Sequence, residues 1–205
     1  MRSGRIDSIR GWALVSLVVV AFNFVACRTA SIPEERFVDY SEVLRQELLG
    51  MRERDQKVRE GFSITMSEET MAAIMAVDGE HLGRLKEIVR QYGWPGKSLV
   101  GADGAEAAWL LVQHAPSPFM KHCLSLLEDA VEAGESEAKH YAYLYDRVQV
   151  QDGNLQRYGT QYKFTPAGVL EREPLSDPES VDQRRAALGL PTMEEYEAIL
   201  KTTYQ

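Results

Sequence analysis

Apolar residues recur every three or four positions over most of the region 37–148, and this spacing predicts a series of amphipathic helices. Glycine, proline and capping residues separate the predicted helices, which cover about 37–59, 66–92, 104–115, 118–133 and 136–148. The stretch GAEAAWLLVQHA is apolar almost all round, so we expect it at the centre of its domain. Asp55 falls on the apolar stripe of the first helix, which is unusual. Thr65 and Glu68 have capping-box spacing before the second helix, and Asp78-Gly79 predicts a break within it.

The pattern changes to a period of two after residue 148. Asp152-Gly153 is a strong hairpin signal, and alternating residues from Tyr158 to Phe164 predict a strand. Pro166-Ala167-Gly168 predicts a further turn, and helices are expected to begin at Asp177-Pro178 and at Thr192. The fold class is therefore mainly α (α+β), a helical bundle-like domain over 36–205 with a small antiparallel β-hairpin or meander near residues 148–172.

Composition limits the classes of partner. The chain has 205 residues, 44% of them hydrophobic, which is enough for one domain with a core. Its net charge of -8 argues against nucleic acid, because phosphates require clustered Lys and Arg. We therefore predict no nucleic-acid partner.

The N-terminus has the layout of a secretory signal. Arg2, Arg5 and Arg10 precede an uncharged run over 11–27 that ends on Cys27. The residues Phe24-Val25-Ala26-Cys27 resemble the bacterial lipobox, although leucine is usual where Phe24 stands. This resemblance implies a signal peptide over 1–26, a lipidated Cys27 that carries palmitate, and a tether over 27–35. It predicts a lipoprotein held in the cell envelope through its lipid anchor, in the periplasm and at the outer membrane, since Arg28 follows the cysteine.

Two alternatives remain open for this region. An uncleaved membrane anchor is the first, although a helix over 11–27 would be only about 25 Å long, short for a bilayer core. A disulfide between Cys27 and Cys123 is the second. Cys123 lies on an apolar helical face, so we expect a buried thiol that is neither a nucleophile nor a partner.

His114 is the main catalytic candidate. It stands at the C-terminal end of the most apolar predicted helix, where it acts either as a general acid–base or as a cap for buried carbonyl groups. Asp146 is the predicted residue that orients it. His81, His122 and His140 are predicted at surface or flanking positions. No histidine pair has zinc spacing, so we predict no metal and no cofactor. Gly96-Lys97-Ser98 lacks the first glycine of a phosphate loop, so a structural turn is expected.

A further set of polar residues could bind a small anionic or peptidic ligand. Guanidinium, amide and phenol groups together can hold a carboxylate or phosphate, and the set comprises Arg147, Gln156, Tyr158, Gln161, Arg184 and Arg185. The same residues could instead form a polar network that ties the sheet to the helices. Asp146 and Arg147 are adjacent on the fifth predicted helix, so one of them should face inward, and a structural ion pair with that inward charge is the alternative to a functional role.

The motifs GWPGKSLVG, AAWLLVQHA, YLYDRV, RYGTQ and VDQRR occur in this order, and the chain from about Glu47 onwards resembles an uncharacterised bacterial family of unknown function. The resemblance implies that certain residues match the family pattern: His114, Asp146, Arg147, Gln156, Tyr158, Gly159, Gln161, Arg184 and Arg185. It implies no activity. Three hypotheses follow: a lipid-anchored protein with a polar ligand pocket, a hydrolase or transferase using His114, and a structural or interaction module.

Overall fold

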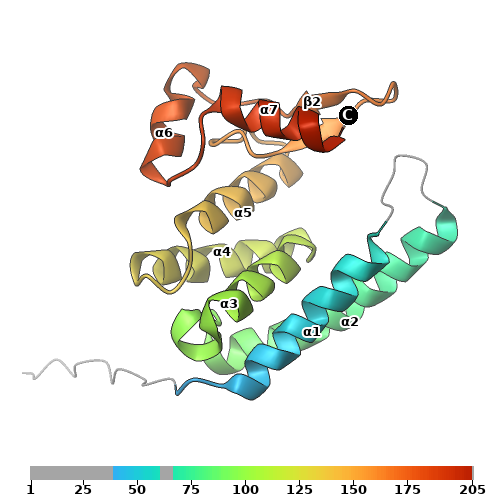
Figure 1. Ribbon diagram of the computed structural model, residues 1–205, viewed down its shortest axis with the longest axis vertical. Coiled ribbons are helices and arrows are strands. Elements are labelled where there is room, and N and C mark those ends of the chain that lie inside the picture. Colours follow the sequence, from blue (N-terminus) through green and yellow to red (C-terminus); the bar gives the residue numbers. More distant parts are fainter. Residues whose placement is uncertain (1–38, 61–66, 205) are drawn as a thin grey trace, which may run out of the picture. The chain divides into compact units, whose positions relative to one another are not determined.

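The computed structural model describes residues 39–60 and 67–204, all of which belong to the compact unit Phe37–Gln205 (Figure 1). The predicted signal peptide, Cys27, the tether and Thr65 lie outside the described residues. The fold is mainly α with a small antiparallel sheet, as predicted. Among the described residues, no helix is long and apolar enough to cross a membrane.

The first five helices follow the apolar periodicity. They are α1 (Glu42–Val58), α2 (Glu68–Tyr92), α3 (Lys97–Gln113), α4 (Ser117–Glu132) and α5 (Ala138–Gln151). Ser41 and Ser67 cap α1 and α2, since their hydroxyl oxygens accept from the N–H groups of Leu44 and Thr70. The predicted break at Asp78-Gly79 is wrong, because α2 runs through it unbroken to Gly93, whose φ of 75° ends the helix.

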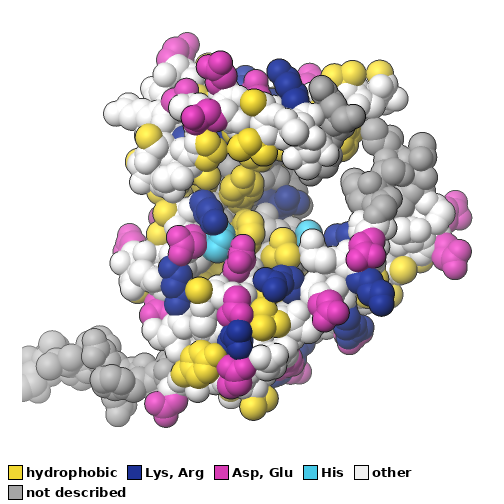
Figure 2. Space-filling view, viewed as in Figure 1, with side chains coloured by type: hydrophobic (Ala, Val, Ile, Leu, Met, Phe, Trp, Pro, Cys, Tyr) yellow, Lys and Arg dark blue, Asp and Glu magenta, His cyan; other side chains and the backbone are white. Residues whose placement is uncertain are grey.

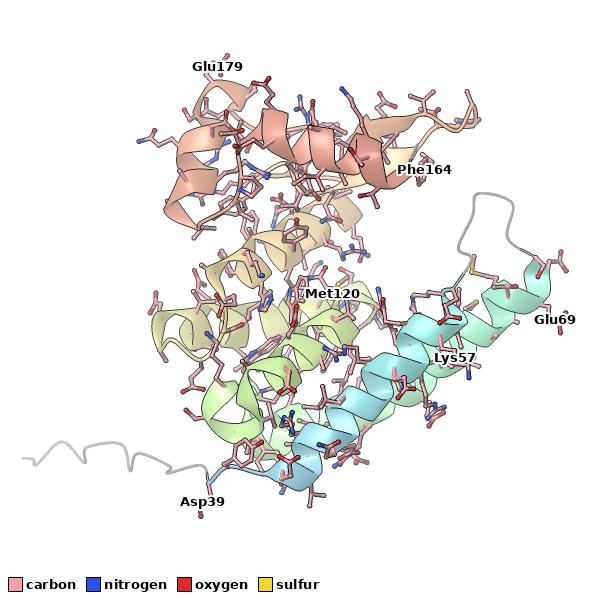
Figure 3. The ribbon with its side chains drawn as sticks, viewed as in Figure 1. Asp39, Lys57, Glu69, Met120, Phe164 and Glu179 are labelled. Atoms are coloured by element: carbon pink, nitrogen blue, oxygen red, sulfur yellow. The ribbon has the colours of Figure 1, made fainter. Side chains whose placement is uncertain are left out.

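Helix α3 is central, as its apolar sequence predicts. It contacts α1, α2, α4 and α5. Gly101, at φ 71°, introduces a non-helical step within α3. The core around α3 includes Leu48, Leu85, Val100, Met120 and Leu127, of which Met120 is labelled in Figure 3. Cys123 is buried and free, and burial raises the pKa of its thiol to about 12.

The hairpin predicted at Asp152-Gly153 is wrong. Helix α5 continues to Gln151, and Gly153, at φ 76°, ends it while the N–H of Asn154 bonds to the carbonyl of Gln149. The sheet consists of β1 (Tyr162–Phe164) and β2 (Leu170–Arg172), which are antiparallel and pair Tyr162 with Arg172. The turn Pro166-Ala167-Gly168 lies between these strands, as predicted.

The chain closes with a short 3-10 helix η1 (Pro178–Ser180), α6 (Val181–Ala187) and α7 (Met193–Tyr204). The predicted capping box before α7 is confirmed: the Glu195 carboxylate accepts from the Thr192 N–H, and the Thr192 hydroxyl accepts from the Glu195 N–H. Figure 2 shows acidic and basic side chains interspersed on one face of the molecule.

Candidate active site

His114 is the C-cap residue of α3, and its ring reaches α1. Nδ1 of His114 lies 2.8 Å from Oδ1 of Asp55. The Asp55 side chain is 1% exposed, whereas that of His114 is 22% exposed. Among the described residues, Nε2 of His114 makes no hydrogen bond. The ring is therefore fixed on its buried side and free at the other nitrogen.

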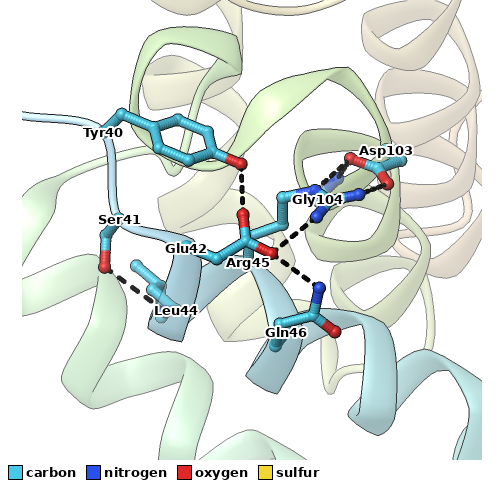
Figure 4. Close-up of polar contacts among 8 residues, drawn as sticks. All are labelled: Tyr40, Ser41, Glu42, Leu44, Arg45, Gln46, Asp103 and Gly104. Atoms are coloured by element: carbon cyan, nitrogen blue, oxygen red, sulfur yellow. Dashed lines mark hydrogen bonds and ion pairs between the residues drawn. The ribbon is translucent and has the colours of Figure 1, made fainter.

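The register between α1 and α3 explains why these residues meet. In the first turn of α1, Arg45 donates two hydrogen bonds to Asp103, which follows the Gly101 step in α3, from Nε at 2.8 Å and from Nη2 at 2.5 Å (Figure 4). Asp55 follows Arg45 by ten residues, about 15 Å of helix, and His114 follows Asp103 by eleven residues, about 16.5 Å, at 1.5 Å per residue. Two matched contacts, Arg45 with Asp103 and Asp55 with His114, thus hold α1 parallel to α3.

Arg59 and Asp78 complete a charged cluster around Asp55. Nη1 of Arg59 lies 2.7 Å from Oδ1 of Asp55, one helical turn earlier on α1. Nη2 lies 2.6 Å from Oδ1 of Asp78 on α2. The Arg59 side chain is only 17% exposed, so this pairing is shielded from water. The unusual acidic residue on the apolar stripe of α1 is therefore the centre of a network that joins α1, α2 and α3.

The network keeps Asp55 ionised. Burial acts to raise the pKa of this carboxyl group, but the hydrogen bond and charge of His114, with smaller contributions from Gln56 and Arg59, outweigh it and lower the pKa. Gln56 donates to Oδ2 at 2.8 Å. A carboxylate held in this state can only accept hydrogen bonds, so Nδ1 of His114 carries the proton.

The same cluster contains a set of metal-ligand types. Ligand atoms of Asp55, Asp78 and His114 lie within 4.8 Å of one another, and two carboxylates with an imidazole suit a divalent transition metal. However, the guanidinium of Arg59 already lies between the two carboxylates. A metal ion there would have to displace it, so the cluster is better explained as an ion-pair network.

Asp146, the residue predicted to orient His114, binds elsewhere. Its carboxylate accepts hydrogen bonds from the backbone N–H groups of Arg157, Tyr158 and Thr160 and from the Thr160 hydroxyl, at 2.7–3.1 Å. The structure pairs His114 with Asp55 instead. Asp146 is fully buried and fixes the segment that follows α5, which is a structural use of the charge.

Gln156, Tyr158 and Gln161 form internal contacts in that segment. The Gln156 amide donates to the carbonyl groups of Gln161 and Glu173 and accepts from the Gln161 N–H. Gln161 also donates to the Thr160 hydroxyl at 3.0 Å. Tyr158 is buried against Tyr145. These contacts match the network alternative for this group of residues.

Two of the three predicted arginines, Arg184 and Arg185, lie on α6 and bond to the segment after α5. Arg185 is fully buried, donates to the carbonyl groups of Tyr158 and Pro191, and lies 4.8 Å over the Tyr196 ring. Arg184 donates to the carbonyl groups of Arg157, Ser176 and Asp177. Both arginines therefore hold α6 to the segment after α5.

Arg147 lies on α5 and bonds to the neighbour of His114. Its Nε donates to the side-chain amide oxygen Oε1 of Gln113 at 2.7 Å, and burial lowers the pKa of this arginine. The buried Nε2 of Gln113 has no partner among the described residues. Arg147 thus orients the side-chain amide beside His114, while the carboxylate of its neighbour Asp146 accepts from the segment after α5.

The predicted surface positions of His81 and His140 are wrong, since both side chains are buried. His81 lies on the inner face of α2, and burial lowers the pKa of its ring. His140 stacks on Trp109 with ring centroids 4.2 Å apart. His122 is exposed, as predicted. The sequence predicted His114 as a candidate and marked Asp55 as unusual on the apolar stripe of its helix, but it did not predict Arg59 and Asp78 as members of the site.

Comparison with known proteins identifies the family of this chain and gives no activity. Residues 42–205 match the model of a family of unknown function, DUF6624. This confirms the resemblance seen in the motifs and extends it slightly beyond the predicted start at Glu47. Neither curated proteins nor solved structures gave a match.

Proposed function

The chain belongs to the DUF6624 family of unknown function, and we propose that it is a cell-envelope hydrolase or transferase in which His114 is the general acid–base. The hydrogen bond between His114 Nδ1 and Asp55 supports this proposal most directly. An imidazole whose Nδ1–H is held by a buried carboxylate presents a lone pair at Nε2, which is the arrangement of a general base.

Each residue of the cluster has a part in the proposed reaction. His114 Nε2 takes a proton from water or from a substrate hydroxyl as that oxygen attacks, and later returns it to the leaving group. Asp55 fixes the ring and stabilises the imidazolium formed in between. Arg59 and Asp78 are positioning residues: Arg59 binds the Asp55 carboxylate and adds to the stabilisation of its charge, and Asp78 holds Arg59 in place.

A polar ligand pocket is less well supported. The side chains of Gln156, Gln161, Arg184 and Arg185 hydrogen-bond to groups of the domain itself, and the Tyr158 ring is buried against Tyr145. Arg147 bonds to Gln113. The cluster around His114 combines a partly exposed ring with a buried carboxylate, so it is the stronger candidate for chemistry.

We further propose that this enzyme is lipid-anchored through Cys27 and faces the periplasm from the outer membrane. The N-terminal segment, basic and then apolar and ending on Ala26-Cys27, supports this location. A lipid anchor leaves the domain in water close to a bilayer, where its substrate would be a component of the envelope or a molecule that reaches it.

A panel of chromogenic esters, anilides, phosphoesters and glycosides tests the activity. We expect wild-type protein to turn over at least one class, and we expect His114→Gln to lose at least about 100-fold in kcat, the scale of general acid–base catalysis. His122→Gln, at an exposed position on α4, is the matched control and should retain activity. Equal rates in wild type and His114→Gln would refute the proposal, as would no turnover of any class by the wild type.

A further inference from the structure

A groove lies between α2 and α4, and none of its lining residues belongs to the cluster around His114. Its volume is about 710 Å³, within the range of about 300–1,000 Å³ that small-molecule sites occupy. Leu82 and Val89 line it from α2, and Phe119 and Leu126 line it from α4. Both helices pack on α3. The groove is mostly apolar, which suits a hydrocarbon chain.

The charged side chains that line the groove, Lys86 and Arg90, are both cations. Lys86 and Arg90 of α2 and the imidazole of His122 on α4 line it, and no carboxylate among the described residues does. All three side chains are exposed. Neither Lys86 nor Arg90 forms an ion pair within the described part of the chain, although Arg45, Arg54, Arg59 and Arg84 each bind a carboxylate. In a chain with net charge -8, two unpaired cations beside an apolar groove attract an anionic ligand to that groove.

We infer that this groove binds a long-chain fatty acid. The acyl chain would lie along Leu82, Val89, Phe119 and Leu126, and the carboxylate would lie between Lys86 and Arg90, which are one helical turn apart on α2. Cationic side chains beside an apolar groove favour an amphiphile whose head group is negative over one whose head group is neutral or positive. An acidic amphipathic helix would need similar chemistry, but the volume favours a single chain. The inference is independent of the His114 site.

Photo-crosslinking of the full chain tests it. A palmitate analogue with a diazirine in its acyl chain is added to the purified protein, irradiated, and located by mass spectrometry of the peptides. We expect crosslinks concentrated in 82–93 and 116–126. Lys86→Glu with Arg90→Glu should reduce labelling of these peptides at least about fivefold, because two attractive charges become repulsive. An alkylamine of equal length with the same diazirine should label the wild type correspondingly less.

Arg52→Glu with Lys57→Glu is the matched control. It makes the same change of charge on α1, at residues that do not line the groove; Figure 3 labels Lys57. Circular dichroism verifies that both double variants are folded. If Lys86→Glu with Arg90→Glu is unfolded, Lys86→Gln with Arg90→Gln takes its place. Crosslinks scattered along the chain, equal labelling by the amine, or equal losses in both double variants would each overturn the inference.

Discussion

Nδ1 of His114 and Oδ1 of Asp55 lie 2.8 Å apart, one at the end of α3 and the other in the last turns of α1. A carboxylate has no proton to donate, so this distance fixes the tautomer of the neutral ring as Nδ1–H. The structure thus specifies the reactive nitrogen of the proposed base, Nε2, without any bound substrate.

Replacing Asp55 by asparagine should change that tautomer. An amide can accept or donate, so we expect the Nε2–H form of His114 to gain population in Asp55→Asn. Long-range ¹H–¹⁵N correlation spectra distinguish the two tautomers. Asp78→Asn is the control, because Asp78 binds Arg59 and makes no bond to His114. A mixed tautomer already present in the wild type would contradict the assigned role of Asp55.

Asp146→Asn should destabilise the fold. The amide nitrogen of asparagine would face N–H donors that now bind a carboxylate oxygen, and each buried donor left unpaired costs about 1–3 kcal/mol. We therefore expect a loss of at least about 2 kcal/mol in the free energy of unfolding, measured by urea denaturation. Asp152→Asn at the end of the same helix breaks a partly exposed pair with Lys121 and should cost under about 1 kcal/mol. Similar losses in the two variants would show that the Asp146 network contributes little.

The helices could be predicted because apolar periodicity and caps are local signals, as at Gly93 and Thr192. The prediction at Asp152-Gly153 was wrong because the same dipeptide occurs in hairpin turns and at the ends of helices. Here the N–H of Asn154 bonds back to the carbonyl of Gln149, which ends the helix. The partner of His114 could not be predicted, since Asp55 is 59 residues away and reaches it only through the register of α1 on α3. Asp146 is nearer to His114 in sequence, but its carboxylate accepts hydrogen bonds from backbone N–H groups of the segment that follows α5.

Gly159→Ala should cost more than Gly153→Ala. Both glycines have positive φ, 71° and 76°, which favours glycine over alanine at either position. A Cβ at Gly159 would come 2.6 Å from Sδ of the buried Met193, whereas one at Gly153 would meet nothing within 4 Å. We expect the difference in the free energy of unfolding to be about 1 kcal/mol or more, the cost of moving a packed side chain. Equal costs would mean that Met193 moves aside freely.

His140 should make the domain sensitive to acid. Burial lowers the pKa of its ring from 6.5 to about 4, with Lys139 and Lys97 adding to the shift and Glu137 opposing it. Between these values the unfolded chain binds a proton that the folded chain does not, so the free energy of unfolding falls as pH drops from about 6.5 to about 4. Histidine NMR titration should give a midpoint near 4 for this ring. In His140→Gln the loss of stability over this pH interval should be smaller, and an unchanged pH profile would contradict the argument.

Cys27 should carry the lipid that anchors the chain. If the leader is cut before Cys27, cells grown with labelled palmitate will label the wild type and will not label Cys27→Ser. Cys123→Ser is the matched control, because the Cys123 thiol is buried and the raised pKa keeps it protonated, so it should retain the label. Intact-mass measurement of the membrane-extracted wild type should show the loss of residues 1–26 together with the added acyl chains. A mass that includes residues 1–26 would instead establish the uncleaved anchor, which the short apolar run over 11–27 disfavours because it spans less than a bilayer core.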